Sequence, residues 1–272
     1  MNAPVNSPAT KPLPMKTLYW EGKSNTGPVA PMSDEERALR VKLAAAYRIF
    51  NMLGWVELIF NHITVRVPGP ETWFLINPFG LHYSEITASN LVLIDVEGNA
   101  VRPSKWPVNR AGFVIHSAIH TDLPDAHCVM HTHTTTGIAV ASLAGGISPH
   151  NFYGAQLYGQ VAYHDFEGVT VNAEEHPRLI ASIGDKRAVV LRNHGLLAWD
   201  ETIEACFFRL YSMQRACDVQ IAAASAGVVN PIHQDVLDLS VKRAGALEPR
   251  LVEDVFAAMQ RLVDEKDPSY RQ

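Results

Sequence analysis

Short apolar strands and amphipathic helices interleave along most of this chain of 272 residues, and no segment repeats another. Such interleaving favours an α/β domain, because the strands can form a sheet while the helices between them cover its faces. Apolar residues make up 47% of the chain and charged residues 19%, which is enough apolar material for one sizeable core. We therefore expect a single α/β domain over residues 32–272.

A capping box marks the start of the first helix. The Ser33 hydroxyl can accept a hydrogen bond from the Glu36 amide, and the Glu36 side chain can reach back to the Ser33 amide. Apolar residues then recur at helical spacing, and Gly54 offers a left-handed stop. Further helical patterns run over residues 113–120, 134–143, 202–226 and 248–263. Strand patterns run over residues 63–67, 73–76, 91–95, 126–133 and 187–192.

Residues 1–31 hold many Pro, Asn, Ser and Thr residues and few aliphatic ones, a composition that cannot by itself offset the entropy of folding. We expect a flexible N-terminal tail there. Because this segment lacks an apolar stretch and a cleavage signature, we do not expect it to be a secretory signal. The three cysteines form no CxxC pair, which excludes a disulfide framework and a cysteine zinc knuckle and favours a reducing compartment, the cytoplasm.

The charge pattern excludes several classes of partner. The formal net charge is −5, and no run of Lys and Arg marks a surface for nucleic acid. No apolar stretch approaches the length of a membrane span. We expect a small-molecule substrate, with no nucleic acid and no membrane among the partners.

Two histidines separated by one residue end the strand expected at 126–133. Side chains alternate across a strand, so His131 and His133 point to the same face, close enough to bind one cation. They would repel each other if both were protonated, which a metal ion or buried neutrality resolves. The competing interpretation is an inert, hydrogen-bonded pair. It is weakened because the pair runs into a helix start at 134–137, and ligand sites of α/β proteins gather at such strand ends.

A third histidine follows another buried strand. His194 lies between Asn193 and Gly195, and the glycine permits a sharp turn and a close approach of the backbone to a ligand. Taken alone, His194 would be better explained as a histidine in a tight turn.

Several segments resemble, in the same order along the chain, those of the class II aldolase/adducin family. Residues 123–133 are similar to the family's metal-binding segment, and residues 191–196 are similar to the segment that supplies its third metal histidine. Residues 75–81, 84–91 and 107–113 look like the adducin-type branch. The likeness extends over residues 33–245.

This resemblance implies a three-layer α/β/α domain with a largely antiparallel central sheet. It also implies a homotetramer with active sites at subunit interfaces, and a divalent metal ion held by His131, His133 and His194. In the sugar-phosphate aldolases of the family, the metal ion polarises a hydroxy-ketone as a Lewis acid. Zn²⁺ is our first expectation, with Mn²⁺ and Fe²⁺ as alternatives, because three imidazoles accept each of them.

Two departures from the aldolases change the expected reaction. The aldolases carry a glutamate as proton shuttle just before the equivalent of Phe113, where this chain has Arg110, Ala111 and Gly112. Their Gly-Asn phosphate loop is replaced by residues 60–62, where Phe60 removes the close backbone approach that a phosphate requires. A phosphorylated sugar is therefore not the expected substrate.

The resulting hypothesis is a metal-dependent carbon–carbon lyase acting on a non-phosphorylated hydroxy or keto acid, or on a hydroxy-aromatic acid. The reaction would be a decarboxylation or a retro-aldol cleavage through a metal-stabilised enolate. A branch of the family decarboxylates hydroxylated aromatic or pyridine carboxylic acids. Arg110 could grip a carboxylate or could simply be solvated. His164 and Glu167 are the candidate proton donors.

Other side chains have supporting roles in this hypothesis. His116 and His120 share a helical face, which favours a place in the core or beside the metal ligands. Phe152, Tyr153 and Tyr158 could line a pocket for an aromatic substrate, although aromatic residues more often only pack.

Two alternatives stay open. The chain could be an adducin-like non-catalytic interaction module, since adducins bind cytoskeletal partners through such a domain. The presence of all three matching histidines argues against this. It could also be a sugar-phosphate aldolase or epimerase with an atypical acid/base.

Overall fold

One seven-stranded sheet organises the chain in the computed structural model, which describes residues 19–20, 31–69, 71–168, 173–247 and 249–272. Its strand order is β4-β3-β2-β6-β9-β8-β7, antiparallel at every step except between β8 and β7. The strands are β2 (Ile63–Arg66), β3 (Phe74–Ile76), β4 (Val92–Ile94), β6 (Cys128–Thr132), β7 (Val161–His164), β8 (Ala188–Leu191) and β9 (Gly195–Asp200).

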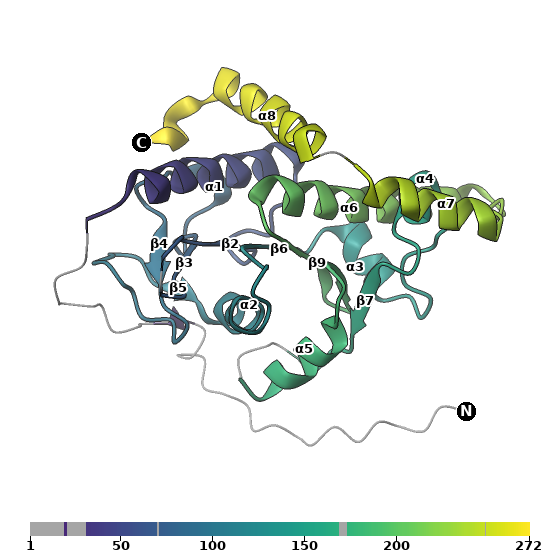
Figure 1. Ribbon diagram of the computed structural model, residues 1–272, viewed down its shortest axis with the longest axis horizontal. Helices are drawn as coiled ribbons and strands as arrows, with labels where there is room; N and C mark the ends of the chain where they lie inside the picture. Colours follow the sequence, from purple (N-terminus) through teal and green to yellow (C-terminus); the bar gives the residue numbers. More distant parts are fainter. Residues whose placement is uncertain (1–18, 21–30, 70, 169–172, 248) are drawn as a thin grey trace.

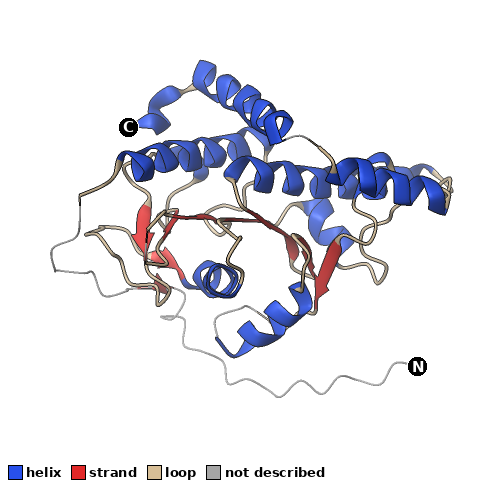
Figure 2. Ribbon diagram, viewed as in Figure 1, coloured by secondary structure: helices blue, strands red, loops and turns tan. Residues whose placement is uncertain are grey.

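Helices cover both faces of this sheet (Figures 1 and 2). On one face lie α1 (Asp34–Leu53) and α6 (Ile203–Ala226), with α8 (Pro249–Lys266) packed on their outer side. On the other face lie α2 (Arg110–Asp122) and α5 (His176–Ile183). The remaining helices are α3 (Thr135–Ala141), α4 (Phe152–Gln156) and α7 (Gln234–Gly245). The expected single α/β/α domain with a largely antiparallel sheet is confirmed.

The alternation of side chains along the central strands divides the core in two. Cys128 and Met130 of β6 pack with α1 and α6, whereas Val129 packs with Ile115 of α2 and Leu179 of α5. His131 follows Val129 by two residues and therefore faces the layer of α2. The sheet thus directs its strand-end histidine away from the larger apolar core.

The first helix begins and ends where the sequence predicts, but one of the two hydrogen bonds predicted for the capping box does not form. The Ser33 hydroxyl accepts from the Glu36 amide at 3.0 Å, and Gly54 ends the helix with φ of 74°. The Glu36 carboxylate does not reach back; it pairs with Arg40 at 2.9 Å and with Arg102 at 2.7 Å. The guanidinium groups of buried Arg40 and part-buried Arg102 attract the carboxylate more strongly than one backbone amide does.

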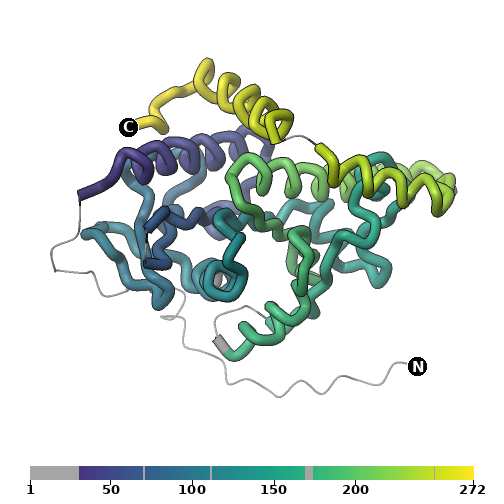
Figure 3. The backbone as a smooth tube through the Cα atoms, in the orientation of Figure 1, coloured from purple at the N-terminus to yellow at the C-terminus, as the bar shows by residue number. Residues whose placement is uncertain are grey.

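The C-terminal segment returns to the first helix. Figure 3 shows α8 and the short 3₁₀ turn Pro268–Arg271 lying along α1. The Tyr270 carbonyl accepts from the Ala88 amide at 2.8 Å, so backbone hydrogen bonds help to fix this return. The three cysteines are free, as expected without a disulfide framework, and all three are buried.

Other differences concern short elements. The helix expected at 113–120 begins earlier, at Arg110, and runs to Asp122. Beyond β8 the chain reverses through His194 into β9, and the patterns did not indicate β7, α4, α5 or α7. The tail expected at 1–31 lies outside the described residues apart from Pro31 and β1 (Tyr19–Trp20), which pairs with β5 (Val108–Asn109). No helix of the described residues is long and apolar enough to cross a membrane.

Candidate metal centre

The end of β6 holds the first histidine of the site in a fixed orientation. His131 is fully buried, and its Nδ1 donates to the Leu196 carbonyl of the adjacent strand β9 at 2.8 Å. A carbonyl oxygen can only accept, so the proton lies on Nδ1, and the lone pair of Nε2 faces the site when the ring is neutral. This is the arrangement that a metal-binding imidazole requires.

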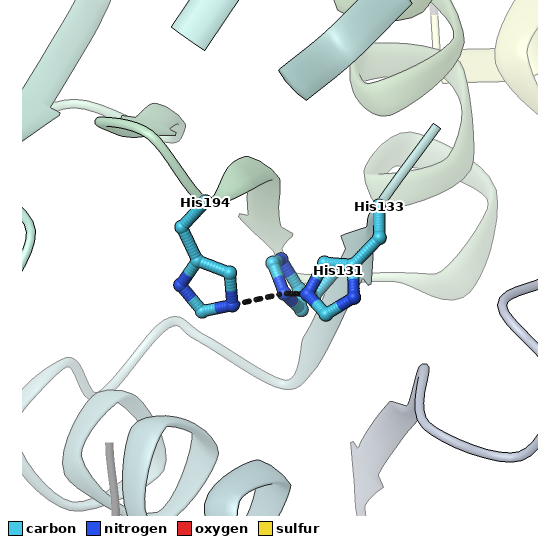
Figure 4. Close-up of side chains that lie close together, drawn as sticks. All are labelled: His131, His133 and His194. Carbon is cyan, nitrogen blue, oxygen red and sulfur yellow. Dashed lines mark hydrogen bonds between the residues drawn. The ribbon is translucent and has the colours of Figure 1, made fainter. Parts of the chain in front are cut away.

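Three imidazole nitrogens converge at this point (Figure 4). The Nε2 atom of His131 lies 2.7 Å from Nε2 of His133 and 3.3 Å from Nε2 of His194. Two ligands at zinc–nitrogen distances in a tetrahedral site stand about 3.3 Å apart, so the second pair already fits and the first must open slightly. The geometry fits a divalent cation with at least one further coordination position for a water or a substrate oxygen.

The β8–β9 turn positions the third histidine. Asn193 adopts a left-handed conformation with φ of 57°, which short polar residues tolerate better than branched ones. A side chain at Gly195 would collide with the Thr132 carbonyl and would come within 3.2 Å of His131 and 3.3 Å of His133. The glycine is therefore required by close packing against β6.

Burial keeps these imidazoles neutral. It lowers the pKa of His131 well below its usual value, with a further contribution from the charges of His133 and His194. Burial also lowers the pKa of His133, and it lowers that of His194 to about 4. Neutral imidazoles are the form that binds metal ions, so the site is ready for a cation near neutral pH without losing protons first.

A fourth histidine adjoins the site, and the sequence did not single it out. The His62 ring lies 5.4 Å from the His131 ring, centroid to centroid, and its Nδ1 is 2.9 Å from Nε2 of His116. A Cβ atom at Gly112 would overlap the His62 ring. The imidazole of His62 thus fills the space that a side chain would take at the position matching the aldolase glutamate. His116 and His120 are both buried beside it.

His164 ends β7 in a buried polar cluster. Its Nε2 lies 3.1 Å from the Glu175 carboxylate, and its Nδ1 lies 3.0 Å from the Ser182 hydroxyl. A water-sized cavity of about 10 Å³ lies beside it and is lined in part by His194. His164 therefore lies near the three histidines, with partners that the sequence did not reveal.

The other candidate residues have different surroundings. The carboxylate of Glu167 makes a two-pronged ion pair with Arg178, at 2.7 and 2.5 Å, and this lowers the pKa of Glu167. Arg110 is half-buried at the first position of α2. Tyr153 of α4 packs against the core between the sheet and α6, in the layer opposite the one that His131 faces.

Comparison with known proteins accounts for this combination of fold and histidines. Residues 41–221 match the model of the class II aldolase and adducin N-terminal domain family. The chain belongs to this family, and the predicted resemblance is confirmed.

Three relatives illustrate the range of the family. A solved structure of an aldolase II superfamily protein from Pseudomonas syringae is 41% identical, covers 88% of this chain and 97% of its own, and superimposes with a TM-score of 0.85. An L-fuculose 1-phosphate aldolase from Glaciozyma antarctica is 28% identical, with coverage of 91% and 97% and a TM-score of 0.78. Alpha-adducin of Rattus norvegicus is 39% identical over 84% of this chain but only 33% of adducin's length.

Proposed function

We propose that this protein is a divalent-metal-dependent lyase that breaks a carbon–carbon bond in a non-phosphorylated hydroxy or keto acid, or in a hydroxy-aromatic acid. The observation that carries the proposal is the convergence of the Nε2 atoms of His131, His133 and His194, with all ligand atoms within 4.8 Å of one another. A non-catalytic module has no need of three neutral imidazoles aimed at one point. A bound cation would polarise substrate oxygens and stabilise the negative charge that develops as the bond breaks.

Arg110 would bind the carboxylate of the substrate. It stands at the first turn of α2, the helix whose Gly112 lies against His62 beside the metal centre. A planar guanidinium can bind a carboxylate with two parallel hydrogen bonds, which holds the acid in one orientation.

His164 is the better of the two candidate proton donors in this proposal. The Ser182 hydroxyl donates to the Arg178 carbonyl at 2.8 Å and so accepts from Nδ1 of His164. Nε2 of His164 faces the Glu175 carboxylate at 3.1 Å, and these two contacts hold the ring beside the cavity that His194 also lines. Glu167 remains a candidate, but its carboxylate is engaged by Arg178 and held in its charged form.

We further propose Zn²⁺ as the resident ion and a homotetramer as the assembly. Three imidazoles with an open position are a common catalytic zinc site, and Mn²⁺ or Fe²⁺ could occupy the same ligands. Size-exclusion chromatography with light scattering and elemental analysis of the purified protein would test both points directly.

The central experiment combines metal binding with a substrate screen. Metal content is measured for the wild type, His131→Ala, His194→Ala and the control His127→Ala, which changes an exposed histidine of the same segment. The metal-loaded protein is then incubated with hydroxy-aromatic acids and hydroxy-keto acids, and carbon dioxide and aldehyde are measured separately. We expect the first two variants to lose the metal ion and all turnover, and the control to keep both.

The relatives support two other functions, and the same experiment distinguishes them from the lyase. Similarity to alpha-adducin supports an interaction module, and a chain that takes up no divalent ion on titration would favour it over the lyase. Similarity to L-fuculose 1-phosphate aldolase supports a sugar-phosphate aldolase or epimerase. Turnover of phosphorylated but not of free substrates would favour that function.

A further inference from the structure

A buried chain of hydrogen bonds runs from the metal centre through α2 to the backbone. His62 Nδ1 contacts His116 Nε2 at 2.9 Å, and His116 Nδ1 contacts the Thr64 hydroxyl at 2.6 Å. The same hydroxyl contacts His120 Nε2 at 2.7 Å, and His120 Nδ1 contacts the Ala126 carbonyl at 2.7 Å. All four side chains are at most 3% exposed, so water does not compete for these bonds.

The Ala126 carbonyl, at the end of this series of hydrogen bonds, fixes which atom donates in every bond of the series. The Ala126 carbonyl can only accept, so Nδ1 of His120 carries a proton. In a neutral ring Nε2 is then bare and accepts from the Thr64 hydroxyl. That hydroxyl has used its only hydrogen and therefore accepts from Nδ1 of His116. By the same step, Nε2 of His116 accepts from Nδ1 of His62.

Burial supports the neutral rings that this reasoning needs. It lowers the pKa of His120 to about 3 and that of His116 well below the usual value for histidine, and the His62 ring is 3% exposed. At its other end, the series of hydrogen bonds therefore leaves a lone pair on Nε2 of His62. Free neutral histidine more often carries its proton on Nε2, so the chain holds His62 in its less common tautomer.

The ring of His62 lies beside the metal centre, with its centroid 5.4 Å from that of the His131 ring. Nε2 has no hydrogen bond to any described residue, and the ring is 3% exposed beside His131. The preceding residue gives an independent sign of a missing ligand. Asn61 is 2% exposed, and neither atom of its amide has a hydrogen-bond partner. Buried polar atoms without partners are rare and costly, which points to a polar molecule that binds here.

We propose that Asn61 and His62 form a subsite for a substrate hydroxyl, in which Nε2 of His62 accepts the hydroxyl's hydrogen bond. His116, Thr64 and His120 are positioning residues that hold His62 in the accepting tautomer. A lone pair repels an anionic oxygen, so the same device disfavours a phosphate at this position. The hydroxyl subsite deepens the proposed lyase function and rests on it, whereas the tautomer of His62 does not.

Substitution of Thr64 should reverse the direction of the hydrogen bond between His116 and His62. In Thr64→Val the hydroxyl is lost at nearly constant volume, and Nδ1 of His116 has no acceptor. His116 then carries its proton on Nε2 and donates to Nδ1 of His62, which moves the His62 proton to Nε2. Thr64→Ser keeps the hydroxyl and is the matched control.

Nitrogen-15 NMR of the histidine-labelled full chain tests the tautomer without a metal ion or turnover. The His62 signals are assigned by their loss in His62→Asn, whose amide can still donate to His116. We expect a bare Nε2 on His62 in the wild type and in Thr64→Ser, and a protonated Nε2 in Thr64→Val. A protonated Nε2 in the wild type would overturn the proposal.

Ligand binding to the zinc-loaded chain tests the subsite itself. The probes are glycolate, which has a hydroxyl, and methoxyacetate, which has an ether oxygen in its place. We expect glycolate to bind about tenfold more tightly than methoxyacetate in the wild type, as one buried hydrogen bond provides. His62→Asn should abolish this preference and keep its zinc. If Thr64→Val does not fold, His62→Asn alone decides.

The two proposals fail in different ways. Equal binding of the probes to the wild type, or a preference that persists in His62→Asn, overturns the hydroxyl subsite even if the protein proves to be a lyase. The expected tautomer and preference in a protein without any lyase activity would contradict the proposed reaction and leave the subsite standing.

Discussion

The close approach of His194 to β6 requires a residue without a side chain at Gly195. A Cβ atom there would collide with the Thr132 carbonyl, and a backbone atom cannot rotate away as a side chain can. We expect Gly195→Ala to push β9 from β6 and to spread the three imidazoles. Zinc affinity should fall at least tenfold, and the free energy of unfolding should fall by about 1–3 kcal/mol. Competition with a chromophoric chelator and urea titration measure the two effects.

Gly145→Ala is the matched control for this substitution. Gly145 has an ordinary backbone conformation and no atom within 4 Å of an added Cβ. Both zinc affinity and stability should stay near those of the wild type. Wild-type zinc affinity in Gly195→Ala would show that the turn can adjust without moving His194.

The sequence alone predicts which residues share the site only where their spacing along one strand determines their relative positions. The two-residue period of a strand placed His131 and His133 together, because their spacing alone fixes their relation. His194 needed the family resemblance, since no local rule brings a turn to a strand over 60 positions away. His62 was missed because its place depends on the lack of a side chain at Gly112, a contact between distant segments.

At the scale of elements, the buried cluster at the start of α1 ties this helix to the loops beside it. The side chains of Glu36 and Arg40 are 4% and 5% exposed, and Arg102 completes the group. Arg40 also donates to the Leu91 carbonyl at 2.8 Å. Removing the carboxylate takes from the buried Arg40 guanidinium the counter-charge that lies 2.9 Å away. We expect Glu36→Ala to lower the free energy of unfolding by about 3 kcal/mol in urea titrations.

The neighbouring Glu35→Ala serves as the control for charge and helix propensity. Glu35 is exposed in the same first turn of α1, so its loss should change stability by about 0.5 kcal/mol at most. Equal effects of the two substitutions would mean that the cluster contributes no more than a surface charge does.

The clarity of an element's own pattern, more than its length, decided whether the sequence could predict it. The strands β3 and β4, of 3 residues each, were predicted, whereas the helix α7, of 12 residues, was missed. Long helices with clear ends, such as α1 and α6, were placed within a few residues because periodicity and caps agree. The strand β7 and the helix α5 were missed. The strand β7 has 4 residues and the helix α5 has 8, and the two pack against each other.

For the molecule as a whole, the two faces of the sheet have different roles. The face under α1 and α6 carries the larger apolar cluster, while the face under α2 also carries buried neutral histidines. Neutral burial of histidine makes folding depend on pH. The unfolded chain binds a proton near pH 6.5, whereas folded His120, with its pKa lowered to about 3 by burial, does not.

The sign of this dependence follows from the number of protons bound. Below pH 6.5 the unfolded state holds more protons, so stability is complete above pH 6.5 and is lost as the pH falls towards 3. We expect His120 alone to contribute a loss of about 1.4 kcal/mol per pH unit in that window. Urea titrations of the metal-free protein at pH 7, 6 and 5 should show about half of this slope or more between pH 7 and pH 6, and about the full slope or more between pH 6 and pH 5. A free energy of unfolding that is constant over this range would contradict it.

Zinc should add a stabilisation that stays nearly constant between pH 7 and pH 5. In most histidine sites protons compete with the metal ion below pH 6.5, and affinity falls. Here burial lowers the pKa of His194 to about 4, and that of His131 lies well below its usual value, so few protons compete in the folded state above pH 5. Urea titrations at a fixed free zinc concentration, paired with metal-free titrations, measure the difference at each pH. A zinc contribution that collapses between pH 7 and pH 6 would mean that the ligands titrate as exposed histidines do. The converging imidazoles would then be accessible to protons, and the metal centre would not be held ready by the fold.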